Sequence, residues 1–283
     1  MPTTTLLESA SGLRVLDYRC QAGPSDIPFS ESFDSYSLSY VARGSFGCTT
    51  RGRHFELVAG SFLIGRPGDD YQCNHEHHHG GDECLSFHWS GAALDAIEVS
   101  SGAWKSGALP ALAPLAVLGA LGRFRAAAAA ECGLDEIALR LAHSFSRLGA
   151  ERTAPRPVRP TLRDRRRAVE AALFIDANAS EPLRLEQIAA RVSVSPFHFL
   201  RLFARVTGLT PHQYLLRARL RRAAALLADP DWRIGDIAFQ VGFRDLSNFV
   251  HTFHRAAGMS PVRFRRLSRA ERKISQDAWQ LPN

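Results

Sequence analysis

The residues best suited to chemistry lie in one short stretch of the N-terminal half, YQCNHEHHHGGDECLSFHW. Side chains along an extended strand alternate between two faces. Cys73, His75 and His77 would therefore share one face, and the alternation continues to His79. The Gly-Gly-Asp that follows would turn the chain, so that ligands from a returning strand could meet them.

The returning strand would present Cys84, Ser86 and His88 on one face. Cysteine thiolates and histidine imidazoles together suit tetrahedral zinc, and a softer ligand shell also admits copper or iron. The sequence therefore predicts a transition-metal site, with zinc as the first choice. Its predicted ligands are Cys73, His75, His77 and Cys84.

Alternatives stay open at this site. His78 or His79 could replace His77 as a ligand. The metal could staple the hairpin or act as a signal sensor, and the plain alternative is an exposed hairpin that is rich in histidine by chance. The remaining cysteines are expected to be small core residues: Cys20, Cys48 and Cys132.

A second set of candidates comes from an internal repeat in the C-terminal half. Ile188 and Ile237, each followed by alanine, lie 49 positions apart. Phe199 and Phe249, each the first of two phenylalanines with a spacing of four, lie 50 positions apart. One residue is therefore inserted in the second copy, between a short segment and a longer one.

Each copy predicts a short helix, a tight turn and a longer helix. Ser195-Pro196 and Asp245 are signals for a helix start, while Gly208 and Gly258 are signals for a helix end. The predicted helices are Leu185–Arg191 and Pro196–Thr207, then Pro211 to about Ala228, then Ile234–Gln240 and Leu246–Ala257.

The longer helix of each copy should turn its phenylalanines inward and leave a polar face outward. Arginine and asparagine can make paired hydrogen bonds to guanine and adenine, while serine and histidine can bind bases or phosphates. The connecting helix, roughly 27 Å long, could hold the two faces near one DNA turn apart, roughly 34 Å. The predicted DNA-contacting residues are Phe197, His198, Arg201, Arg205, Ser247, Asn248, His251 and Arg255.

Charge and composition agree with an anionic partner. The net charge is +7, and arginine is concentrated in clusters at 163–167, 217–222 and 263–266. The sequence has no run of 18 apolar residues that could span a membrane. It also has no signal-peptide pattern, in which basic residues precede an apolar stretch. We therefore expect a cytoplasmic protein without membrane contact. Five scattered cysteines do not suit a disulfide framework.

The distribution of residue types along the chain predicts two domains, each with its own core. Residues 12–90 alternate strand-length apolar runs with turn residues, and residues 111–148 have alanine and leucine at helical spacing with a break near Cys132. Three prolines in residues 151–160 predict a linker. The expected division is 1–150 sensor and dimerisation domain, 151–165 linker, 166–270 DNA-binding domain and 271–283 tail.

The segments LRLEQIAARVSVSPFHFLRLFARVTGLTPHQYLLRARLRRAAALL and IGDIAFQVGFRDLSNFVHTFHRAAGMSPVRFR resemble the DNA-binding domain of the AraC/XylS family of transcription regulators. The GF, GMSP and RFR signatures of the second segment carry most of the resemblance. It implies DNA recognition by the two longer helices and a cupin-like β-barrel with a dimerising helical pair ahead of them. The expected fold is α+β, the expected assembly a homodimer, and RNA polymerase a candidate partner.

We expect a signal-responsive regulator that binds double-stranded operator DNA and is not an enzyme. One alternative is a metal-dependent cupin enzyme with a DNA-binding appendage, because the same ligands could leave one coordination position open. No acid-base pair or nucleophile accompanies them in the sequence. Another alternative is a structural nucleoid protein, which would bind DNA without sequence preference.

Overall fold

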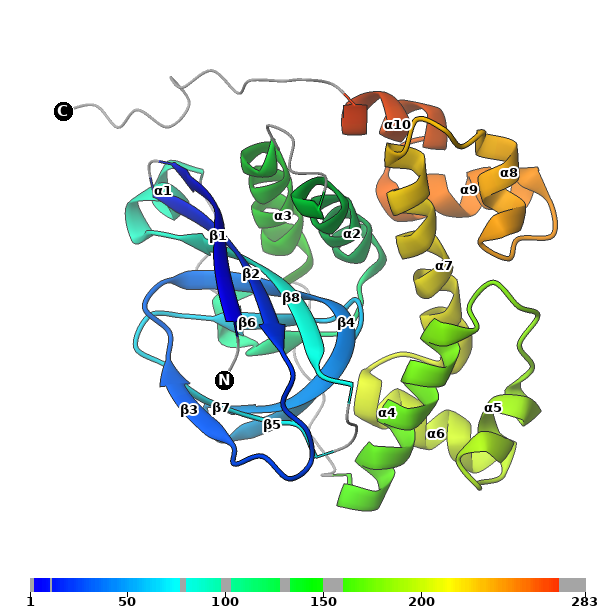
Figure 1. Ribbon diagram of the computed structural model, residues 1–283, viewed down its shortest axis with the longest axis horizontal. Helices are drawn as coiled ribbons and strands as arrows, with labels where there is room; N and C mark the ends of the chain where they lie inside the picture. Colours follow the sequence, from blue (N-terminus) through cyan, green and yellow to red (C-terminus); the bar gives the residue numbers. More distant parts are fainter. Residues whose placement is uncertain are drawn as a thin grey trace.

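The computed structural model describes residues 3–10, 12–76, 80–97, 103–127, 133–149 and 160–269. Strands dominate up to Leu109 and helices follow, and the two parts lie side by side (Figure 1). This order agrees with the predicted β-rich N-terminal part and helical C-terminal part. Residues 151–159 of the predicted linker, the predicted tail, His77, His78, His79 and Cys132 lie outside the described residues.

The strands form two connected antiparallel sheets. One has the order β1-β2-β8-β4-β6-β9, and the other consists of β3, β7, β4 and β5. The strands are β1 (Thr3–Ala10), β2 (Leu13–Cys20), β3 (Phe29–Ser32), β4 (Tyr36–Thr50), β5 (Arg53–Val58), β6 (Phe62–Gly65), β7 (Asp70–Asn74), β8 (Asp82–Trp89) and β9 (Ala108–Leu109).

The long strand β4 belongs to both sheets. Its first part pairs with β6 and β8, and its second part pairs with β5 and β7. The register shifts between Val41 and Arg43, where such an irregularity bends a strand toward the second sheet. The edge strands β1 and β9 do not pair with each other in the described part of the chain, so the expected cupin-like barrel is not closed there.

The predicted hairpin around the histidine-rich stretch is wrong. Strand β7 pairs with β3 and β4, whereas β8 pairs with β2 and β4. Alternation along a strand identifies which side chains share a face, but it does not identify the neighbouring strand. The strands β7 and β8, consecutive in the sequence, therefore belong to different sheets.

Two short helical segments precede β9, and the other helices follow it. They are α1 (Gly91–Ala96), the 3-10 turn η1 (Ala103–Lys105), α2 (Ala113–Ala127), α3 (Leu134–Gly149), α4 (Leu162–Ala177), α5 (Leu185–Arg191), α6 (Pro196–Thr207), α7 (Pro211–Ala228), α8 (Ile234–Gln240), α9 (Leu246–Ala257) and α10 (Pro261–Arg269). Helices α5 to α9 have the bounds that the sequence predicted, and α2 and α3 form the predicted helical pair.

Helix α2 joins the two parts into one packed structure. Its buried residues occupy every face of the helix, because small and apolar side chains surround its axis. It packs against β4 and β8 on one side and against α7 and α9 on the other (Figure 1). The largest apolar cluster therefore runs from the sheet into the C-terminal helices, and the expectation of two separate cores is wrong.

Local signals explain where the C-terminal helices begin. The Ser195 hydroxyl accepts a hydrogen bond from the backbone nitrogen of His198 at 3.4 Å. Asp245 accepts one from the backbone nitrogen of Asn248 at 2.7 Å. These are the capping bonds expected at both longer helices.

Helix α4 begins inside the segment predicted as linker. The Thr161 hydroxyl accepts a hydrogen bond from the backbone nitrogen of Asp164 at 3.1 Å, which caps the helix at this point. Residues 162–165 are therefore helical, and the predicted linker extends too far.

Arg219 of α7 connects the two helix-turn-helix units. Its Nε donates to the carbonyl oxygen of Ala179 at 2.7 Å, and its Nη2 donates to that of Glu181 at 2.9 Å. Gly242, in the turn between α8 and α9, lies against the same guanidinium and against the carbonyl oxygen of Ser180. The loop before α5, helix α7 and the second turn therefore meet at one point.

We predict that Gly242→Ala destabilises the protein more than Gly258→Ala does. Both glycines have a positive φ, +95° and +70°, so each substitution brings backbone strain of about 1 to 2 kcal/mol. An added Cβ at Gly242 would lie 2.6 Å from the Ser180 oxygen, whereas none of the described atoms lies within 4 Å of one at Gly258. The clash should add roughly 1 to 3 kcal/mol in urea unfolding, and equal losses in the two variants would contradict this contact.

Candidate nucleic-acid interface and metal centre

Helix α6 separates an apolar face from an exposed one. Phe199 and Phe203 are fully buried, and their ring centroids lie 5.5 Å apart. Phe197, at the start of the same helix, is 71% exposed although it is a large apolar residue. The exposed face of the helix therefore presents an aromatic ring together with the exposed side chains of His198 and Arg201.

Helix α9 repeats this arrangement. Phe249 and Phe253 are fully buried, and the Phe253 ring packs edge-on against Phe264 of α10. The Thr252 hydroxyl donates to Asn248 Oδ1 at 3.2 Å, which orients the Asn248 amide on the helix surface. All eight predicted DNA-contacting residues are exposed on these two helices: Phe197, His198, Arg201, Arg205, Ser247, Asn248, His251 and Arg255.

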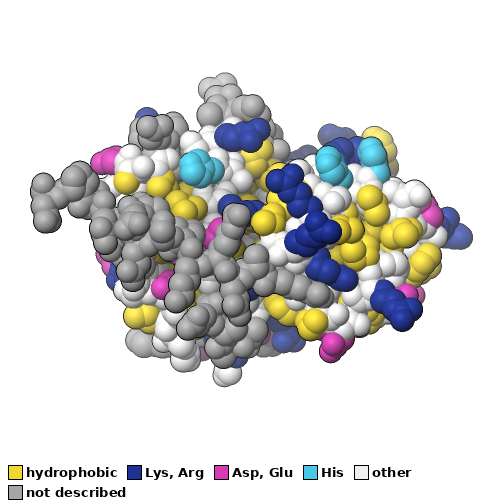
Figure 2. Space-filling model, turned by 90° about the horizontal axis from the view of Figure 1, so that it is seen from above, with side chains coloured by type: hydrophobic (Ala, Val, Ile, Leu, Met, Phe, Trp, Pro, Cys, Tyr) yellow, Lys and Arg dark blue, Asp and Glu magenta, His cyan; other side chains and the backbone are white. Residues whose placement is uncertain are grey.

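Positive and titratable side chains gather over the C-terminal helices. Figure 2 shows arginine and histidine side chains across this part of the surface, with acidic side chains toward its edge. Arg244 and His254 are also exposed at α9, one just before its cap and the other in its last turn. Sequence reasoning missed both, although their position beside the second predicted polar face could have indicated them.

A cavity of about 340 Å³ lies between the two sheets of the N-terminal part. Cys84, Ser86 and His88 of β8 line it together, as the alternation of that strand predicted. Cys73 and His75 line it from β7 and the residue after it. The two arms of the histidine-rich stretch therefore face one cavity from different sheets.

Three potential ligands come together in this cavity. The Sγ of Cys20, a ring nitrogen of His75 and a carboxylate oxygen of Asp82 all lie within 4.8 Å of one another. His75 Nε2 and Asp82 Oδ2 are 2.7 Å apart, and all three residues are less than a tenth exposed. The Cys84 thiol donates to Asp82 Oδ1 at 3.5 Å. Sulfur, nitrogen and oxygen donors at this spacing suit a tetrahedral transition metal.

This group overlaps only in part with the predicted ligand set. His75 belongs to it, while Cys73 and Cys84 line the same cavity outside it. Cys20 was expected to be a plain core residue, but it lies directly opposite Asp82 where β2 pairs with β8. That pairing joins segments far apart in the sequence, and no local signal indicates it.

Burial shifts the pKa values of titratable side chains that line this cavity. It raises the pKa of the Cys20 thiol, and it raises that of Cys84 with a further contribution from Asp82. Burial also lowers the pKa of His88 to about 4, and the neutral ring lies within hydrogen-bond distance of the Ser35 and Ser86 hydroxyls. The thiols are therefore protonated at neutral pH, and a bound metal ion would have to displace their protons.

Among the helices that the structure describes, none has the length and apolar content needed to cross a lipid bilayer.

Known proteins similar to this chain match it in its C-terminal helices. A family model described as a helix-turn-helix domain matches residues 188–267. The chain is 38% identical over 100 residues to the melibiose operon regulatory protein of Escherichia coli K12, which is 35% of this chain and 33% of that protein. It is 36% identical over 98 residues to the bifunctional transcriptional activator/DNA repair enzyme AdaA of Bacillus subtilis, which is 35% of this chain and 46% of that protein.

The similarity spans about a third to under a half of these relatives. Among solved structures, an AraC-type DNA-binding domain-containing regulator from Chromobacterium violaceum is 31% identical, covers 37% of this chain and 94% of that chain, and has a TM-score of 0.36. The matched helix-turn-helix model and the named regulators agree with the resemblance found in the repeat. The C-terminal region of the chain is therefore similar to the helix-turn-helix domains of AraC/XylS-type transcription regulators.

Proposed function

We propose that this protein is a sequence-specific, signal-responsive transcription regulator that places α6 and α9 in the major groove of double-stranded DNA. The observation that carries the proposal is the repeated amphipathic helix. Each copy buries a phenylalanine pair and exposes a polar face, and α7 joins them with 18 residues. A helix of that length spans roughly 27 Å, close to one DNA turn of roughly 34 Å.

The exposed side chains suit distinct roles on DNA. Arg201 can bond guanine with two donors, and Asn248 can bond adenine with its amide. Phe197 offers an apolar surface for a thymine methyl group. The N-terminus of α6, where the cap is the uncharged Ser195, favours a phosphate group because the helix dipole attracts anions.

We predict that Arg201→Ala and Asn248→Ala each weaken binding to a selected DNA sequence by about 1 to 3 kcal/mol. The target is obtained by letting the full chain select from a random-sequence DNA library. Affinity is then measured by fluorescence anisotropy on the selected sequence and on a scrambled duplex of the same length. Binding to the scrambled duplex should change little.

Arg19→Ala is the matched control, because it removes the same charge from an exposed position on β2 in the N-terminal sheet. It should leave both affinities nearly unchanged. Equal losses on selected and scrambled DNA in the Arg201 and Asn248 variants would contradict base reading. Failure to select any motif would favour the nucleoid-protein alternative.

We further propose that the cavity between the sheets holds a transition-metal ion, with zinc as the first choice, and that this part of the protein is the sensor. Cys20, His75 and Asp82 would be the ligands, because they converge at metal-binding spacing in a buried polar group. Cys84 lies beside Asp82 and is the candidate for a fourth ligand. Four protein ligands would favour a structural or sensing ion over a catalytic one.

We predict that full-length protein purified with zinc contains about one ion per chain by elemental analysis, and that Cys20→Ser removes most of it. Cys73→Ser distinguishes the two ligand sets, since it should retain the metal here but lose it if the set predicted from the sequence is correct. Cys48→Ser is the control, because Cys48 is buried nearby but outside the group. A metal-free parent protein after zinc loading would exclude the site.

The homodimer and a contact with RNA polymerase stay predictions. The metal-dependent enzyme alternative requires an open coordination position, so saturation of the ion by four protein ligands in X-ray absorption spectra would argue against it.

A further inference from the structure

Three arginines on one face of helix α4 have no role in the functions proposed above. Their positions, 163, 166 and 167, are three or four residues apart, which is the spacing of neighbours on a helix surface. Arg163 and Arg166 are exposed, and neither makes a hydrogen bond or an ion pair within the described part of the chain. Both guanidinium groups are therefore open to a partner of opposite charge. We call Arg163, Arg166 and Arg167 the α4 ridge.

The α4 ridge starts beside the first helix-turn-helix unit. At the end of α5, Arg191 Nε lies 3.8 Å from Glu170 Oε1 of α4. Three residues earlier on α4, Arg167 Nη2 donates to the carbonyl oxygen of Ser193, in the turn before α6, at 3.5 Å. Arg163 lies one helical turn further along the same face, about 6 Å beyond Arg167 at about 1.5 Å per residue. The ridge therefore begins at the turn that leads into α6 and continues outward from it.

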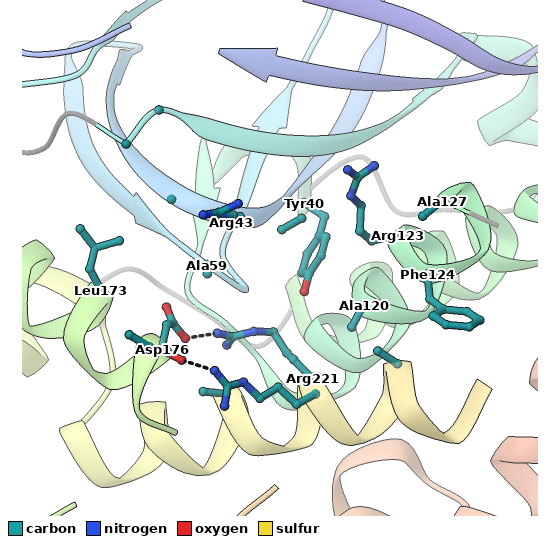
Figure 3. A pocket seen from close by; sticks show the side chains of 18 residues that line it. Tyr40, Arg43, Ala59, Ala120, Arg123, Phe124, Ala127, Leu173, Asp176 and Arg221 are labelled. Carbon is teal, nitrogen blue, oxygen red and sulfur yellow. Dashed lines mark hydrogen bonds and ion pairs between the residues drawn. The ribbon is translucent and has the colours of Figure 1, made fainter. Parts of the chain in front are cut away.

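Polar contacts fix the helix that carries the ridge. Arg165, in the same arginine-rich stretch, points toward the sheet instead, and its Nη1 lies 3.8 Å from Glu56 Oε1 of β5. At the other end of α4, Asp176 accepts a hydrogen bond from Arg221 of α7 at 2.5 Å, and Figure 3 shows these two side chains facing each other. Because α4 is held at both ends, the ridge presents its charges at a fixed place beside the first unit.

DNA phosphates are the partner that this position favours. In a helix-turn-helix unit the second helix enters the major groove while the first crosses the DNA backbone, so the turn between them lies close to phosphates. Arginine bonds phosphate oxygens with paired donors, and its charge releases counterions from the duplex. Within the described residues, neither Asp164 nor Glu170 of α4 forms an ion pair with the ridge, and Glu170 is paired with Arg191. The ridge charges are therefore uncompensated.

We propose that the α4 ridge binds backbone phosphates of the DNA that flanks the bases read by α6. This rests on the proposed function, because α6 must enter the major groove for the ridge to reach the backbone. Phosphates are the same in every sequence, so the ridge adds affinity and orients the chain on the duplex without reading bases. The contact surface on DNA then extends beyond the two recognition helices onto α4.

The test replaces both exposed arginines of the ridge in the full chain, Arg163→Gln together with Arg166→Gln. Fluorescence anisotropy measures DNA affinity at several salt concentrations, on a duplex selected from the random library and on a scrambled duplex of the same length. Two lost phosphate contacts should lower the slope of log affinity against log salt by about 1.8, and should weaken binding to both duplexes about tenfold at about 0.1 M salt. An unchanged slope would overturn the proposal.

Two further double variants separate the ridge from net charge. Arg163→Lys with Arg166→Lys should retain most of the slope, because lysine also binds phosphate as a point charge. The matched control, Arg19→Gln with Arg66→Gln, removes the same two charges from exposed positions in the N-terminal half and should keep the parent slope. A fall in the control as large as in the ridge variant would mean that net charge alone is responsible, and the proposal would be wrong.

Hydroxyl-radical footprinting on the selected duplex locates the lost contacts. The ridge variant should shorten the protected stretch at its edge and leave the centre protected, and loss at the centre alone would contradict the proposal. Failure of base reading is recognised separately, because the parent would then bind selected and scrambled DNA equally while the salt slope still tests the ridge. A parent that binds neither duplex would overturn both the ridge and the proposed function.

Discussion

The hydrogen bonds of the buried Asp176 carboxylate hold helices α4 and α7 against the sheet, and the arrangement of these parts depends on them. It accepts a hydrogen bond from Arg221 of α7 and one from the Tyr214 hydroxyl at 2.6 Å. The same hydroxyl lies 3.3 Å from the carbonyl oxygen of Ala59, in the turn after β5. Burial raises the pKa of Asp176, and Arg221 opposes that rise. Helices α4 and α7 and the sheet therefore meet at one buried polar contact, and removing one partner would leave a buried group uncompensated.

The fold gives the arginine-rich stretch at 217–222 a structural role in place of the DNA-binding role that its charge indicated. On charge alone it favoured a nucleic-acid surface, but in the fold its side chains bond inward. Arg217 donates to the carbonyl oxygen of Ala111 at 2.6 Å, and Arg219 and Arg222 donate to carbonyl oxygens around the end of α4. The long arginine side chains of helix α7 thus donate hydrogen bonds to backbone carbonyl oxygens at the ends of neighbouring loops. The residues expected to meet DNA lie on α6 and α9 instead.

Local features of the C-terminal half could be predicted from the sequence because they depend on neighbouring residues. The caps at Ser195 and Asp245 and the phenylalanines at a spacing of four determine both the helix bounds and the exposed faces. The N-terminal half depends on strand pairing between distant segments. Cys20 and Asp82 are separated by most of the sheet in sequence and meet only because β2 lies beside β8. Alternation correctly placed Cys84, Ser86 and His88 on one face, but it could not identify their neighbours.

The single residue inserted in the second copy makes the two units unequal. The second turn runs from Val241 to Asp245, while the first runs from Val192 to Ser195, and only the second is braced by Arg219. Two identical readers related by a two-fold axis would recognise a palindrome in either orientation. Two different helix-turn-helix units on one chain would instead make the protein bind the duplex in one defined orientation. Reversing its target sequence would then change which side of the bound protein faces the neighbouring gene.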